Sequence, residues 1–319
     1  MRKLTAIVSA AVLAVSLTGC GLNVNAALPY DVKPGSIRPV PSLEGVTVTV
    51  GSKDFTENII LGYIAELALS AAGADVVDMT NIAGSNSGRQ ALINGQIDLM
   101  WEYTGTAWLS YQGNDKPIAG EREQYEAVKE ADAKQNGIEW LDYSPLNDTY
   151  AFGTTEAYAQ QHNLKSNSDM TAFLKQHPDQ AVFCVETEFA SRPDGFPGVQ
   201  KTYDFPATNV KTFGTGAIYS AIASGTCNFG EIFTTDGRIA GLNLRVLDDD
   251  KKFFPQYNAA VTMKQSFLQA HPALADVLVP VGKALDNQQM IELCKQVDVD
   301  GKDAGEVARD WMISKGFIS

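Results

Sequence analysis

Four aromatic residues lie where predicted strands run into loops, beside glycine, threonine or aspartate: Tyr103, Tyr150, Phe233 and Tyr257. An aromatic ring presents a negative face and an apolar wall together, which attracts a cation. A quaternary ammonium has no N–H to donate, so ring faces suit it better than a lone carboxylate. Each ring taken alone is more simply explained as a core residue. Their common placement at loop entries is what indicates a binding site.

Other chemistries find little support in the sequence. It contains no Gly-x-Ser-x-Gly elbow, no paired-carboxylate motif and no Cys-x-x-Cys, and His162, His177 and His271 lack metal-ligand spacing. We therefore expect no enzyme activity, no metal and no cofactor. The net charge of −13 repels phosphate backbones, so we expect no nucleic-acid partner.

The elements that must position the rings alternate between strand and helix. Strands are expected at 46–50, 75–80, 97–103, 150–154, 181–186 and 230–234, and helices after 54 and at 87–94, 121–135, 168–177, 216–224 and within 264–317. Asp54 and Glu57 form a possible capping box for the first helix. This order predicts two α/β lobes, with a ligand cleft outside the carboxyl ends of the strands.

The N-terminus has the pattern of a lipoprotein signal peptide. Arg2 and Lys3 precede an apolar stretch, 4–17, that is too short to span a bilayer. It ends in Leu17-Thr18-Gly19-Cys20, which resembles the bacterial lipobox; the alternative is an ordinary signal peptide with a chance cysteine. We expect a signal peptide at 1–19, lipidation of Cys20, and a flexible tether over 20–45 because prolines interrupt that segment.

Three further cysteines follow Cys20. An extracytoplasmic location permits a disulfide, and our prediction is a Cys184–Cys227 bridge with Cys294 as a buried thiol. The sequence alone does not fix this pairing.

Six motifs in order resemble a known family, the glycine betaine, choline and carnitine binding proteins of osmoprotectant ABC importers, of the ProX and OpuC type. The resemblance covers about residues 46–319. The motifs are Gly51-Ser52-Lys53-Asp54-Phe55-Thr56-Glu57, Glu102-Tyr103-Thr104-Gly105-Thr106, Asn147-Asp148-Thr149-Tyr150, Glu188-Phe189-Ala190-Ser191-Arg192-Pro193-Asp194-Gly195, Phe233-Thr234-Thr235-Asp236-Gly237-Arg238 and Asp249-Asp250-Lys251-Lys252-Phe253-Phe254-Pro255-Gln256-Tyr257.

The resemblance implies a role for each matching residue. Tyr103, Tyr150, Phe233 and Tyr257 fall where the family boxes a trimethylammonium group, and Phe233 replaces the usual tyrosine. Lys53, Thr106 and Arg192 match residues that meet the ligand's carboxylate, and Asp148 falls where a backbone carbonyl faces the cation. Without the resemblance, Arg192 would be expected to pair with Glu188 or Asp194, and Lys53 to be a solvated turn residue.

The family further implies a type II periplasmic-binding-protein fold. We expect lobe 1 to comprise 46–147 plus 258–319 and lobe 2 to comprise 148–257. The expected function is that of an extracytoplasmic, lipid-anchored, monomeric solute-binding protein that captures a quaternary ammonium compound, above all glycine betaine, and delivers it to an ABC permease and its ATPases. The alternatives are a binding protein for another amino acid or a polyamine, an extracytoplasmic enzyme, or a sensory receptor.

Overall fold

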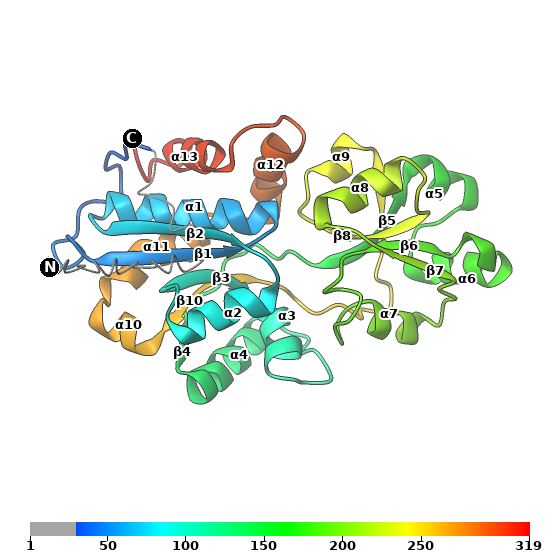
Figure 1. Ribbon diagram of the computed structural model, residues 1–319, viewed down its shortest axis with the longest axis horizontal. Helices are drawn as coiled ribbons and strands as arrows, with labels where there is room; N and C mark the ends of the chain where they lie inside the picture. Colours follow the sequence, from blue (N-terminus) through cyan, green and yellow to red (C-terminus); the bar gives the residue numbers. More distant parts are fainter. Residues whose placement is uncertain (1–29) are drawn as a thin grey trace, which may run out of the picture.

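The computed structural model describes residues 30–319, which form two α/β halves side by side (Figure 1). Each half is built on one five-stranded sheet of the described chain. The first sheet has the order β2-β1-β3-β10-β4: β2 Asp75–Ile82, β1 Thr47–Lys53, β3 Leu99–Tyr103, β10 Ala259–Lys264 and β4 Ile138–Trp140. The second has the order β7-β6-β8-β5-β9: β7 Asn209–Thr212, β6 Val182–Val185, β8 Phe229–Phe233, β5 Tyr150–Thr155 and β9 Leu244–Leu247. We call these halves lobe 1 and lobe 2.

Helices cover both sheets. Lobe 1 carries α1 Thr56–Ala71, α2 Ser85–Asn94, α3 Thr104–Thr106, α4 Glu121–Asn136, α10 Gln265–Ala270, α11 Ala273–Lys283, α12 Asn287–Asp298 and α13 Ala304–Ser314. Lobe 2 carries α5 Glu156–His162, α6 Asn167–Gln176, α7 Phe196–Tyr203, α8 Thr215–Ala223 and α9 Arg238–Gly241. Strand β1 runs parallel to β2 and β3, as the alternation of strands and helices predicted, whereas β10 and β5 pair antiparallel with their neighbours.

The start of α1 differs from the sequence-based expectation. The residue before the helix is Phe55, and no side chain caps it. The capping box is therefore wrong: Asp54 accepts the backbone N–H of Gly84 instead, at 3.2 Å, and Glu57 turns into the protein interior. Both carboxyls are used for contacts beyond the helix, which a local sequence pattern does not reveal.

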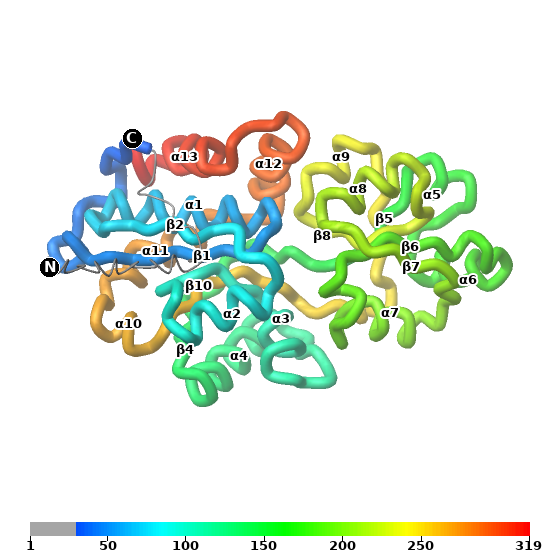
Figure 2. The backbone as a smooth tube through the Cα atoms, in the orientation of Figure 1, coloured from blue at the N-terminus to red at the C-terminus, as the bar shows by residue number. Residues whose placement is uncertain are grey.

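Two chain segments cross between the lobes, 141–149 and 248–258, and Figure 2 shows them running between the halves. They meet at an isolated antiparallel bridge between Asn147 and Asn258. The side-chain oxygen of Asn147 accepts the backbone N–H of Tyr257 at 2.8 Å, and Asn287 of α12 bonds both the N–H and the carbonyl of Asn147. These contacts fix the place where the two crossing segments meet, which we call the hinge. It lies next to Asp148, Tyr150 and Tyr257 in the chain.

The expected tether is wrong for residues 30–45. The backbone N–H of Ser36 bonds the carbonyl of Gly316 at 2.7 Å, and Val40 bonds Ala72 at 2.8 Å. Leu43 is fully buried in the core of lobe 1. Residues 34–37 lie against residues 316–318 near the C-terminus and pair with them instead of standing free. The predicted signal peptide and Cys20 lie outside the described residues.

Cys184 and Cys227 form a disulfide that ties β6 to the start of β8, and Cys294 is a free, buried thiol, the pairing suggested from the sequence. Burial raises the pKa of the Cys294 thiol well above its ordinary value. Within residues 30–319, none of the helices has the length and apolar character needed to cross a bilayer.

Candidate functional site

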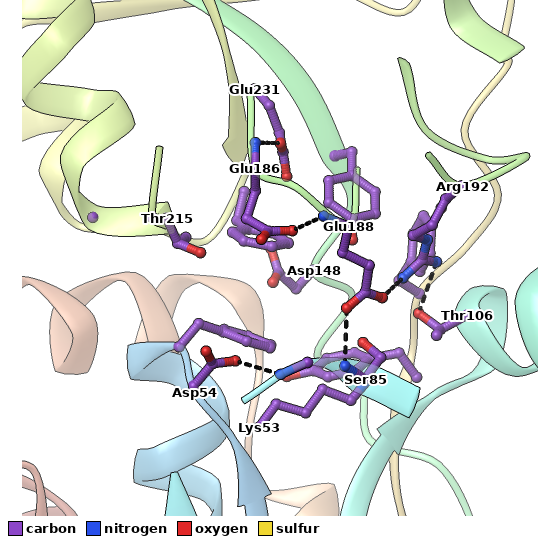
Figure 3. Close-up of a pocket in the computed structure, with 18 of the residues that line it drawn as sticks. Lys53, Asp54, Ser85, Thr106, Asp148, Glu186, Glu188, Arg192, Thr215 and Glu231 are labelled. Atoms are coloured by element: carbon purple, nitrogen blue, oxygen red, sulfur yellow. Dashed lines mark hydrogen bonds and ion pairs between the residues drawn. The ribbon is translucent and has the colours of Figure 1, made fainter. Parts of the chain in front are cut away.

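A cavity of about 330 Å³ lies between the lobes, at the small end of the range for small-molecule sites (Figure 3). Its walls include all eight residues that the sequence nominated for ligand binding: Lys53, Tyr103, Thr106, Asp148, Tyr150, Arg192, Phe233 and Tyr257. These residues come from both lobes and from the crossing segments, so the cavity depends on how the lobes meet.

The rings lie close to one another around this space. Tyr150 is central: its ring centroid is 5.0 Å from that of Phe233 and 5.3 Å from that of Tyr257, which stands perpendicular to it. A fifth ring, Phe55, stacks on Phe233 at 5.1 Å with an interplanar angle of 13° and lies 5.9 Å from Tyr103. Phe55 was not among the predicted ligand-binding residues, although it ends the loop after β1 inside the first motif.

Glu57 holds the Tyr103 ring in place. The Tyr103 hydroxyl donates to Oε1 of Glu57 at 2.8 Å, and Asn58 donates to the same hydroxyl at 3.2 Å. Oε2 of Glu57 accepts the hydroxyl of Thr235, from lobe 2, at 2.6 Å. Burial raises the pKa of Glu57 to about 7, although the hydrogen bonds from Thr235 and Tyr103 oppose this rise.

Asp148 lies at the first crossing segment and lines the cavity with 4% of its surface exposed. Its Oδ1 accepts the backbone N–H of Thr235 at 3.4 Å. Burial, and then the nearby Glu57 carboxyl, raise the pKa of Asp148 well above its ordinary value. A cation in the cavity would favour the ionised form of Asp148 and so lower its pKa.

Lys53 is buried rather than solvated. Its Nζ lies 2.9 Å from Oε2 of Glu102 and 5.1 Å from the centroid of the Tyr103 ring. The charge of one carboxylate thus balances that of the ammonium, which has three N–H donors to offer to its partners.

Arg192 pairs with both Glu188 and Asp194, the partners expected for it without the family resemblance. Its Nε donates to Asp194 at 2.9 Å, Nη2 forms a second bond to Asp194 at 2.5 Å, and Nη1 donates to Glu188 at 2.8 Å. Nη2 also lies 3.3 Å from the hydroxyl of Thr106 in lobe 1. Burial opposes ionisation of Asp194, but the Arg192 charge and hydrogen bonds lower its pKa overall. Arg192 therefore joins the lobes as well as facing the cavity.

The structure also places two glutamates in the wall that the sequence analysis did not nominate, Glu186 and Glu231. Glu186 follows β6, and Glu231 lies inside β8 with 3% of its surface exposed. A glutamate within a buried strand is the sequence signal that could have revealed Glu231. Burial raises the pKa of Glu231 to about 8 and also raises that of Glu186.

Direct contacts hold the two lobes together across the cleft. Oε2 of Glu188 accepts the backbone N–H of Ser85 at 2.9 Å. Arg238 pairs with Asp236 within lobe 2 and reaches Asp298 of lobe 1 at 3.4 Å. Across residues 30–319 no cluster of histidine, cysteine, aspartate or glutamate forms a metal site.

Comparison with known proteins shows which families and structures this chain is similar to. Residues 46–314 match the model of the family described as the substrate binding domain of ABC-type glycine betaine transport systems. The chain is 34% identical to a glycine-betaine-binding protein of Pseudomonas aeruginosa over 83% of this chain and 87% of that protein. It is 30% identical to an ergothioneine transport permease/binding protein of Helicobacter pylori, over 88% of this chain and 49% of that longer protein. A crystal structure titled glycine betaine/carnitine/choline ABC transporter superposes with a TM-score of 0.69, at 25% identity, over 85% of this chain and 99% of that one. The expected two-lobed fold is confirmed.

Proposed function

Since the chain belongs to the family of substrate-binding domains of ABC-type glycine betaine transport systems, we propose that it traps a quaternary ammonium ligand between its lobes inside a cage of aromatic rings. The family consists of transport binding proteins, so this chain is a substrate-binding protein of glycine betaine, carnitine and choline import. The cage and its residues are our proposal.

One observation carries the proposal: five rings from both lobes and the hinge line a single buried cavity. Phe55 and Tyr103 come from lobe 1, Tyr150 and Phe233 from lobe 2, and Tyr257 from the crossing segment. Each desolvated cation–π contact contributes about 2 kcal/mol, so several of them reach the scale of a micromolar complex before docking costs are subtracted. Glycine betaine, carnitine, choline and ergothioneine all carry a trimethylammonium group, so the relatives' names agree on the cation.

The basic side of the cavity suits a carboxylate. Arg192 directs four hydrogen bonds to Asp194, Glu188 and Thr106, which leaves one N–H of its guanidinium. Lys53 retains donors beyond its contact with Glu102. We propose that the carboxylate of a betaine binds here, with Thr106 beside it.

The delivery steps are also proposed. The Leu17-Thr18-Gly19-Cys20 sequence supports an anchor at Cys20, which would hold a monomeric binding protein outside the cell near its permease and ATPases. Incorporation of an alkyne-labelled fatty acid into the wild type, and none into Cys20→Ser, is the expected result. Labelling of both proteins would contradict the anchor.

The proposed ligand class is tested by calorimetric titration of the purified mature protein with choline and with 3,3-dimethylbutanol, in which carbon replaces nitrogen. The two molecules share a shape, so only the charge differs. We expect choline to bind at micromolar concentration and the uncharged isostere about a hundredfold more weakly, on the cation–π scale. Equal binding would refute the cage.

A further inference from the structure

The cavity has an acidic wall in lobe 2 that the proposed function does not use. Glu186 directly follows β6, and Glu231 lies in β8, the parallel neighbour of β6. Figure 3 shows both in the upper part of the view, on the side away from Lys53. Thr215, at the beginning of α8, lies to one side of them in the same view. Neither a trimethylammonium group in the ring cluster nor a carboxylate beside Lys53 accounts for two glutamates at this position.

In each of these two carboxyl groups, one oxygen accepts hydrogen bonds from the protein and the other does not. Oε2 of Glu231 accepts the backbone N–H of Glu186 at 2.8 Å, and Oε2 of Glu186 accepts the N–H of Glu188 at 2.5 Å and of Phe189 at 3.4 Å. Among residues 30–319, no hydrogen bond reaches Oε1 of either glutamate. Such an acceptor, once it has lost its water and gained no donor, costs free energy.

The surrounding charges do not neutralise this wall. Besides burial, the charges of Glu186 and Glu188 raise the pKa of Glu231 and that of Arg192 lowers it, but the guanidinium of Arg192 already pairs with Glu188 and Asp194. The raised pKa of Glu231 agrees with this uncompensated burial. A ligand that presents an O–H or N–H donor to the free oxygens would satisfy them, and it would favour the ionised form of Glu231.

We propose that the free oxygens of Glu186 and Glu231 form a second subsite, which accepts an O–H or N–H group of a ligand whose quaternary nitrogen occupies the ring cluster. This subsite rests on the proposed function, because the rings fix where the rest of the ligand lies. It selects quaternary ammonium compounds that also carry a hydrogen-bond donor. Glycine betaine has no such donor, so water must fill the subsite when it binds.

The test compares choline with n-propyltrimethylammonium, in which a methyl group replaces the hydroxyl. Titration of the mature protein with both cations gives the ratio of their dissociation constants. We expect choline to bind about tenfold more tightly, because a site built for a donor rejects the analogue that lacks it. Equal affinities would overturn the subsite and leave the cage intact, whereas failure of both cations to bind would refute the proposed function itself.

Variants identify the groups responsible. The double variant Glu186→Gln/Glu231→Gln keeps the shape and lets an amide oxygen accept the backbone N–H groups, but it replaces each free carboxyl oxygen with an NH2 group that cannot accept. We expect the choline preference to fall about threefold or more. Asp54→Asn removes a negative charge from an exposed part of the cavity rim and should leave the ratio unchanged. An unchanged ratio in the double variant, or an equal fall in Asp54→Asn, would contradict the assignment.

Discussion

Glu57 and Thr235 lie 178 residues apart in the chain and in different lobes, yet the Thr235 hydroxyl donates to the Glu57 carboxylate at 2.6 Å. The other oxygen of that carboxylate holds the hydroxyl of Tyr103. One buried side chain thus couples the contact between the lobes to the orientation of a ring in the proposed cage. Closure and ligand binding should therefore depend on each other.

Removing the Thr235 hydroxyl should weaken every ligand of the cage together. In Thr235→Val the shape is kept, but the Glu57 oxygen loses the donor that reaches it from the other lobe. A hydrogen bond to a charged group contributes about 1.5–3 kcal/mol, so we expect about a tenfold or greater loss of affinity for choline and glycine betaine alike. Titration calorimetry measures this loss.

The matched control is Thr212→Val, at an exposed position of β7. It should bind as the wild type does. An undiminished affinity in Thr235→Val would show that the Glu57–Thr235 contact has no part in closure.

Tyr150 should contribute more to ligand binding than any ring outside the cavity. In Tyr150→Leu the apolar bulk remains while one cation–π face is lost, so choline should bind about thirtyfold more weakly, corresponding to about 2 kcal/mol. Tyr143→Leu alters a half-buried ring at the start of the first crossing segment that packs against Tyr125 and Arg122, and it should leave binding unchanged. Comparable losses in both variants would indicate a general loss of stability instead.

Stability should fall as pH rises through the neutral range. The pKa of Glu231 is raised to about 8 in the folded protein, against about 4.3 for an unperturbed glutamate. The folded state therefore holds a proton that the unfolded state releases, and this stabilisation is complete below about pH 4 and lost as pH rises through 8. Thermal unfolding should show a melting temperature several degrees lower at about pH 8.5 than at about pH 5.5.

Glu57, whose pKa is raised to about 7, adds to the same trend, so the variant Glu231→Gln isolates one contribution. Its melting temperature should change less across that range than that of the wild type. Parallel curves for the two proteins would mean that Glu231 titrates as an ordinary carboxyl.

The disulfide should stabilise lobe 2 substantially. Cys184 and Cys227 are separated by 43 positions, for which the loop-entropy relation gives about 4 kcal/mol as an upper value. Denaturant unfolding of Cys184→Ser/Cys227→Ser should therefore show a loss of about 2–4 kcal/mol. Cys294→Ser, which removes the free thiol only, serves as the comparison, and an intact midpoint in the double variant would contradict the role of the bridge.

Much of this fold follows from periodicity. The first five elements, from β1 to β3, alternate apolar strands with helices, and residue patterns locate them within a few positions. By contrast, β10 was not predicted: its antiparallel place between β3 and β4 depends on pairing over more than 100 residues. No local pattern carries that information.

The site, like the fold, has features that the sequence predicts and features that it does not. The resemblance placed eight residues that the structure brings to one cavity, but it gave no sign of the pairing between Lys53 and Glu102, or of the acidic wall. Glu57 was interpreted as a capping residue because its spacing from Asp54 fits a local motif, whereas its real partners come from β3 and from lobe 2. Long-range polar partners are what sequence reasoning misses here.

The central claim is that a methylated, permanently positive centre sits among the rings. Arsenocholine, in which arsenic replaces the nitrogen of choline, makes that position directly visible in a crystal of the complex through the anomalous scattering of arsenic. We predict one strong anomalous peak in van der Waals contact with the ring faces of Tyr103, Tyr150, Phe233 and Tyr257. A peak outside the cavity would contradict the account. So would a complex in which these rings pack elsewhere and do not contact the arsenic.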